Sequence, residues 1–166
     1  MREFAISFDN LACAGTFTLI FVQPATAPNC NLEFLRYWVG QSANATSNQQ
    51  RIEIDTQVSS WPTAMTSATV NKLKPADPNA SIITGASSPA LGQAGIVLSA
   101  NQVEGAGAKT IVWNDAFNVL NGWLHVPTPP ETRVLPASLT SGQGLFFPTV
   151  PTTTTGWAAG LCFREV

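Results

Sequence analysis

The stretch Gln50–Val58 constrains the fold of this chain more than any other segment, because its polar and apolar residues alternate with a period of two. One phase holds the apolar and β-branched residues Ile52, Ile54, Thr56 and Val58. The other phase holds the polar and charged residues Arg51, Glu53, Asp55 and Gln57. Since successive side chains leave a β-strand on opposite faces, the stretch predicts a strand with one face on a core and the other in water.

Further segments alternate in the same way or are rich in β-branched and aromatic residues, and turn residues separate them. We expect strands at Glu3–Phe8, Thr16–Gln23, Asn31–Gly40, Thr69–Leu73, Lys109–Trp113, Gly122–Val126, Thr132–Leu135, Gly144–Phe147 and Thr155–Val166. Between Asn79 and Gly107, the glycines and prolines favour strand fragments in long loops.

Local features within these segments give finer expectations. The apolar phase changes at Phe34–Leu35, which predicts a bulge there or coverage of both faces. Asp9–Asn10 is expected to be a turn, and Asp115–Asn121 a single helical turn. One face of the last strand carries the small residues Ala158, Gly160 and Cys162, which leave room for a closely packed neighbour.

Many short strands without a convincing helix predict an all-β fold, an antiparallel β-sandwich or barrel. A jelly roll is the version we expect, because many of the loops are too long for two-residue hairpins. With 166 residues, the chain has the length of one domain, so we expect a single β-sandwich domain over residues 1–166.

Charged residues make up only 11% of the chain, whereas roughly a quarter is usual in soluble domains. A soluble chain with so few charges has a surface of small polar residues or a surface that partner chains cover. The net charge of −2 provides no basic field for phosphate backbones, so nucleic acid is not an expected partner. No apolar run approaches the roughly 20 residues that span a bilayer, and the N-terminal segment lacks the basic region of a secretion signal. We therefore expect no membrane association.

The residue types that usually carry chemistry are sparse and scattered. Cys13, Cys30 and Cys162 have neither the spacing of a disulfide framework nor that of a zinc site, and we expect three buried free thiols. His125 is the only histidine and is expected to be an exposed or hydrogen-bonded strand residue rather than a catalytic base.

Glu53 and Asp55 lie two residues apart on the predicted strand, so they share a face and superficially suit the carboxylate pair of a glycosidase. Arg51 shares that face, however, and a mixed-charge row is typical of a solvated strand or a subunit contact. The sequence thus predicts no catalytic residue, no cofactor and no metal site, and a protein that is not an enzyme. We keep Arg51, Glu53 and Asp55 as candidate partner contacts.

Five tryptophans are many for a chain of this length. Most lie within predicted strands, where a core or an interface accounts for them. Trp61 lies in the loop Ser59–Thr63 and is the best candidate for an exposed contact, including stacking on a sugar.

Several features together resemble the small jelly-roll structural proteins of tailed bacteriophage particles, in particular the decoration or cement proteins on the capsid shell. The features are the N-terminal strand, Gln49–Ile54 after a small polar loop, Leu73–Pro78, the Trp123 strand followed by Pro127–Pro130, and Trp157–Phe163. The resemblance is one of overall pattern and matches no motif position by position.

This resemblance implies a protein that is made in the host cytoplasm, binds the major capsid protein on the outer surface of the virion as a homotrimer, and strengthens the shell. A surface with few charges suits burial against identical neighbours. The alternatives are a receptor- or carbohydrate-binding β-sandwich module of a phage tail or bacterial surface, with Trp61 as its contact, and a small β-sandwich hydrolase that uses Glu53 and Asp55.

Overall fold

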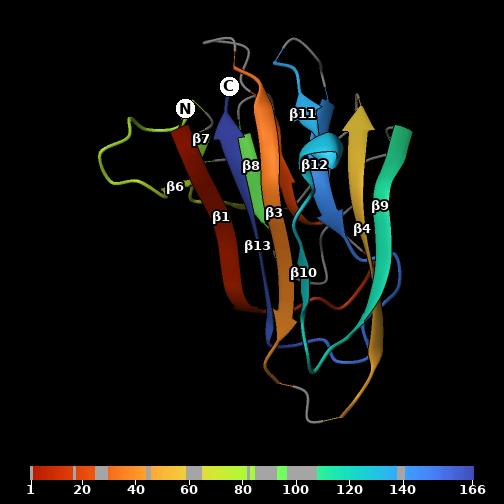
Figure 1. The fold of residues 1–166 in the computed structure, drawn as a ribbon. Helices are drawn as coiled ribbons and strands as arrows, with labels where there is room; N and C mark the ends of the chain where they lie inside the picture. Colours follow the sequence, from red (N-terminus) through yellow and green to blue (C-terminus); the bar gives the residue numbers. More distant parts are fainter. Residues whose placement is uncertain are drawn as a thin grey trace.

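The computed structural model describes residues 2–16, 18–24, 30–43, 46–58, 65–81, 83–84, 93–96, 108–137 and 141–166. Two β-sheets pack face to face, which confirms the expected antiparallel β-sandwich (Figure 1). The described residues include no helix of the length and hydrophobicity needed to cross a membrane. The helical element they do contain is the short 3₁₀ turn η1 (Pro129–Glu131).

Sheet A has the strand order β10-β3-β13-β1-β6, and β11 also pairs with β3. Its strands are β1 (Arg2–Leu11), β3 (Leu32–Gln41), β6 (Asn71–Lys72), β10 (Trp123–His125), β11 (Val134–Leu135) and β13 (Trp157–Glu165). Figure 1 shows β1, β13 and β3 side by side on the left of the molecule. All pairings in this sheet are antiparallel among the residues described.

Sheet B has the order β5-β8-β2-β12-β4-β9, with β7 paired to β8. Its strands are β2 (Thr18–Val22), β4 (Gln49–Val58), β5 (Thr66–Ser67), β7 (Ile83–Thr84), β8 (Gln93–Ile96), β9 (Ala108–Asn118) and β12 (Ser141–Phe146). The short β7–β8 contact is parallel, and the other described pairings are antiparallel. β9 lies at the edge of the sheet, on the right in Figure 1.

The core between the sheets follows the period-two pattern of the sequence. Ile52 and Ile54 of β4 are buried, as predicted, and so is the apolar phase of β13. In that phase, the Trp157 ring lies 4.8 Å from the Phe147 ring in an edge-to-face arrangement. Aromatic pairs of this geometry add about 0.5–1.5 kcal/mol beyond the burial of their area.

The small residues of β13 leave room for a closely packed neighbour, as expected, and that neighbour is Trp38. Gly160 is paired with Trp38 of β3, and the Trp38 ring lies directly over it. A Cβ added at Gly160 would lie 1.8 Å from Trp38 Cζ2. Only glycine leaves that space on the outer face of sheet A.

The predicted bulge at Phe34–Leu35 is also present. Opposite it, Cys162 pairs with Arg36 and Phe163 pairs with Phe34, so Leu35 is the extra residue. The bulge lets Phe34 and Tyr37 both face the core although they are three residues apart.

Two local predictions were wrong. The segment Asp9–Asn10 is not a turn, because β1 continues to Leu11 through an irregular register in which Asn10 has a φ of 54°. Asp115–Asn121 does not begin as a helical turn, because β9 continues to Asn118, which pairs with Gln49 of β4. At Asp115–Asn118, pairing with β4 satisfies the backbone, and this outweighs the local turn preference.

Candidate functional site

The polar row of β4 is mostly buried, contrary to the expected solvated face. Glu53 and Asp55 are 9% and 1% exposed, whereas Arg51 is exposed. The neighbouring strand β12 has a glycine opposite Asp55, and a Cβ added at Gly144 would lie 2.9 Å from Asp55 Oδ1. The missing side chain thus provides the space that the carboxylate occupies. Lys109 Nζ lies 4.0 Å from Asp55 Oδ2 and balances its charge.

Arg51 and Glu53 lie at the exposed end of the predicted contact row of β4. Arg51 Nη2 lies 4.0 Å from Glu53 Oε1, so the two charges are close at the exposed end of the row. Contact between this row and a partner stays a prediction, and Arg51 is the member with an exposed side chain. Trp61 lies outside the described residues.

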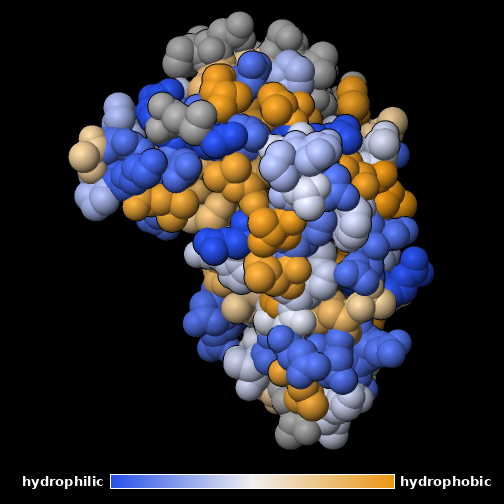
Figure 2. Space-filling model, in the orientation of Figure 1, coloured by the Kyte–Doolittle hydropathy of each residue, from blue (hydrophilic) through white to orange (hydrophobic). Residues whose placement is uncertain are grey.

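The outer face of sheet A carries large apolar side chains that are exposed. Leu124 and Val126 are 63% and 57% exposed, and Leu73 and Val134 are exposed too. Leu124 is paired with Trp38 and Val134 with Glu33, and residues directly opposite each other share a face. We call Leu73, Leu124, Val126 and Val134 the apolar face. Figure 2 shows apolar patches where β3 and β10 run in Figure 1.

A shallow hollow connects the two sides of the apolar face. Its lining includes Leu73 and Val126 together with Leu35, Arg36 and Cys162 of the central strands. The apolar face therefore extends across sheet A, from β6 to the end of β10.

The charged groups near the apolar face have partners. Arg164 Nη2 donates to Glu33 Oε1 at 2.7 Å, and this ion pair lowers the pKa of Glu33. Lys74 Nζ lies 3.6 Å from Glu3 Oε2. Arg36 lies over the Trp38 ring, 5.3 Å from its centroid. Arg164 and Lys74 thus pair with acidic groups, whereas Arg36 packs on an aromatic ring.

Strand β9 is exposed along most of its length. Within the described part of the chain it pairs with β4 alone, and its residues 108–111 and 113–116 are exposed. Such a long edge strand presents unpaired backbone N–H and C=O groups and is a natural place for a second chain to pair.

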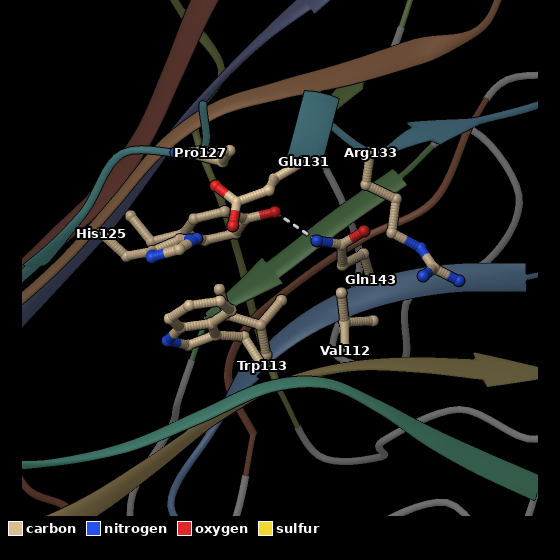
Figure 3. A pocket seen from close by; sticks show the side chains of 9 residues that line it. Val112, Trp113, His125, Pro127, Glu131, Arg133 and Gln143 are labelled. Atoms are coloured by element: carbon tan, nitrogen blue, oxygen red, sulfur yellow. Dashed lines mark hydrogen bonds between the residues drawn. The ribbon is translucent and has the colours of Figure 1, made fainter. Parts of the chain in front are cut away.

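A pocket of about 270 Å³ lies between the sheets beside β9. It is lined by Tyr37, Ile54, Val112, Trp113, His125, Pro127, Glu131, Arg133 and Gln143. Figure 3 shows Trp113 on one side of the pocket, Glu131 and Arg133 on the other, and His125 and Gln143 between them.

His125 lies within an aromatic cluster rather than free in solvent. Its ring centroid is 4.7 Å from that of Trp113, 5.8 Å from that of Trp123 and 6.0 Å from that of Tyr37. Trp123 Nε1 donates to Asp115 Oδ2 at 3.0 Å, which fixes the Trp123 ring. Burial among these rings lowers the pKa of His125, although the charges of Glu131 and Asp115 oppose that shift. The imidazole is therefore mainly neutral at neutral pH.

The polar groups of the pocket come from three separate segments. Gln143 Nε2 of β12 donates to Tyr37 Oη of β3, across the core. Glu131 of η1 forms a capping box, because its Oε2 accepts hydrogen bonds from Thr128 N (3.1 Å) and Thr128 Oγ1 (2.6 Å). These bonds lower the pKa of Glu131 and keep it ionised. Arg133 lies in the short link between η1 and β11.

Sequence reasoning did not identify the pocket. The Thr128–Glu131 spacing matches a capping box, and it could have predicted that the Glu131 carboxylate bonds to Thr128. Gln143 gave no signal, because a glutamine between two glycines in a strand is unremarkable until its partner on the opposite sheet is known. In the described residues, no group of three or more histidine, cysteine or acidic side chains could hold a metal ion.

Comparison with known proteins gives this chain no family. No family model, no curated protein and no solved structure matches it.

Proposed function

We propose that this protein is a structural virion protein, a decoration or cement protein that binds the outer surface of a phage capsid through the apolar face of sheet A. The observation on which the proposal rests is the apolar face itself. Leu124 in β10 and Val126 directly after it are large apolar residues, and both are more than half exposed. Large apolar patches on a folded protein mark surfaces that another protein covers. Arg164 and Lys74 beside it already have acidic partners, so covering them would not leave either charge without a counterion.

The strand order supports a jelly-roll topology, which the resemblance to decoration proteins implies. Neighbouring strands follow β1-β13-β3-β10 in sheet A and β2-β12-β4-β9 in sheet B. Among these eight strands the chain therefore changes sheet at each step from β1 to β4, from β9 to β10, from β10 to β12 and from β12 to β13, and stays in one sheet only from β4 to β9. We infer that these eight strands form two Greek keys, the arrangement of a jelly roll.

We further propose a homotrimer in which β9 contacts a neighbouring copy. The strand is exposed over most of its length, and Ile111 on it is more than half exposed. An edge strand that is left open invites pairing or packing with a second chain, and closed symmetry limits how many copies join.

Shell binding is tested by co-sedimentation with empty shells of the major capsid protein that the same genome encodes. The wild-type protein is expected to sediment with the shells, and the double variant Leu124→Asp/Val126→Asp to stay in the supernatant. Val150→Asp is the matched control, because Val150 is 60% exposed but lies outside the apolar face. A wild-type protein that never sediments with shells, or a double variant that binds like the control, would overturn the proposal.

The trimer is tested separately by sedimentation equilibrium over a range of protein concentrations. A mass of three chains is expected for the wild-type protein and for Val150→Asp, and a lower mass for Ile111→Asp. A monomer at every concentration would exclude self-association in solution.

A further inference from the structure

The pocket beside β9 contains polar groups that the fold leaves unused. Gln143 is 1% exposed, and its Oε1 has no hydrogen-bond partner. Glu131 uses Oε2 for both of its bonds to Thr128, which leaves Oε1 as a free acceptor. The Arg133 guanidinium makes no ion pair or side-chain hydrogen bond with the residues described. Buried polar atoms normally have partners, so an unpaired amide oxygen in a pocket indicates a missing donor.

The apolar part of the pocket is an aromatic surface. Trp113 is 39% exposed, and the His125 ring lies against it. The capping box fixes Glu131, and the stacked Trp123 ring supports His125 from the other side. The walls of the pocket are thus largely preformed, which reduces the entropy lost when a ligand binds.

The chemistry of these groups selects a class of ligand. The charges of Glu131 and Arg133 cancel, so the pocket favours a ligand without net charge. Glu131 Oε1 and Gln143 Oε1 require hydrogen-bond donors, whereas the Arg133 guanidinium requires an acceptor. The exposed Trp113 ring can stack on a flat apolar side of a ligand. A pyranose ring meets all of these demands, because its hydroxyl groups both donate and accept and one side of the ring consists of C–H groups.

We propose that this pocket binds one neutral pyranose unit, with Trp113 against the C–H side of the ring and its hydroxyl groups on Glu131, Arg133 and Gln143. The volume of about 270 Å³ lies just below the roughly 300–1,000 Å³ of sites for drug-sized ligands, which suits a single sugar unit. The proposal does not rest on Trp61 and does not depend on capsid binding.

The single histidine makes binding directly observable. His125 is the only histidine of the chain and borders the pocket, so its ring C–H signals in a ¹H–¹³C NMR spectrum report on the pocket alone. The probes are the methyl glycosides of glucose, galactose, mannose and N-acetylglucosamine. At least one of them is expected to shift the His125 signals saturably, with a dissociation constant in the millimolar range that is typical of small ligands with few contacts.

Two variants test the geometry, with one control. Trp113→Ala is expected to weaken binding about tenfold through loss of the aromatic contact, and Arg133→Met to weaken it without altering the fold. Leu124→Asp is the control, since Leu124 lies on the same strand as His125 but on the outer face, and it should bind the glycoside like the wild-type protein. Thermal unfolding of each variant establishes that it is folded.

Three results would overturn the proposal. The first is the absence of any shift of the His125 signals with all four glycosides. The second is an equal shift in a folded Trp113→Ala variant, which would place the sugar elsewhere. The third is binding of methyl glucuronate or N-acetylneuraminate alone, which would show that Arg133 selects an anion instead of a neutral sugar.

Discussion

The hydrogen bond between Gln143 and Tyr37 joins the two sheets inside the core, and its removal should destabilise the fold measurably. Both side chains are 1% exposed, and the Gln143 amide already has one unpaired atom, Oε1. Tyr37→Phe keeps the ring and its stacking on Phe34 but removes the hydroxyl group. The Gln143 N–H then loses its partner, and a buried donor without a partner costs about 1–3 kcal/mol. We expect the free energy of unfolding to fall by that amount.

A double-mutant cycle separates this hydrogen bond from packing effects. Gln143→Leu has nearly the same side-chain volume and leaves the Tyr37 hydroxyl without its donor, so it should also destabilise by about 1–3 kcal/mol. The double variant Tyr37→Phe/Gln143→Leu has neither polar group and should be close to the wild-type protein in stability. The interaction energy between the two substitutions should therefore equal the sum of the two single costs, about 2–6 kcal/mol, with the sign that restores stability.

Urea unfolding followed by tryptophan fluorescence measures all four proteins of the cycle, with an unchanged slope of free energy against urea as the check on two-state behaviour. Simple additivity, within about 0.5 kcal/mol, would refute the reasoning, because it would mean that water in the neighbouring pocket already satisfies the Gln143 amide. Two neutral single variants would refute it as well.

Three further predictions follow from other parts of the structure. Gly160→Ala should lower the free energy of unfolding by about 1–3 kcal/mol, because its Cβ would meet the Trp38 ring, whereas Gly40→Ala meets nothing within 4 Å; equal stability of the two variants in urea would contradict the close packing. An NMR titration of His125 should give a pKa below 6.5. Because the unfolded chain then binds the proton more readily, the free energy of unfolding should fall as the pH drops below about 6.5, and His125→Gln should lose this dependence. Burial raises the pKa of Cys13 to about 12, so iodoacetamide at neutral pH should modify Cys13 in urea but not in the native protein, as peptide mass spectrometry would establish.

The sequence was sufficient to predict which side chains are buried in strands whose two faces differ in polarity. In β13, every second residue from Trp157 to Phe163 is apolar and buried, and this alternation indicates which side chains reach the core. Its other phase is small, and that predicted close packing before the partner, Trp38, was known. Residue i and residue i+2 share a face in any strand, so such predictions need no long-range information.

The buried polar row of β4 could not be predicted in that way. Whether Asp55 faces water depends on what covers the outer side of its sheet, and in particular on Gly144 of β12, far along the chain. The same applies to the pocket, where Glu131 and Gln143 come from different elements and approach Trp113 only in the folded chain. Strand order sets these contacts, and period-two alternation contains no information about strand order.

Strand β10 connects the two proposed sites, and its alternation also keeps them independent. Leu124 points outward and belongs to the apolar face, whereas His125, one residue later, points inward and borders the pocket. Because neighbouring side chains of a strand lie on opposite faces, a substitution at Leu124 changes the surface proposed for the capsid without touching the pocket. Trp113 reaches the pocket from sheet B and meets sheet A at His125 on the inner face, so its substitution leaves the outward-pointing Leu124 in place. Loss of shell binding with retained sugar binding, and the reverse, are therefore both attainable with substitutions confined to one site, and each proposal can fail without the other.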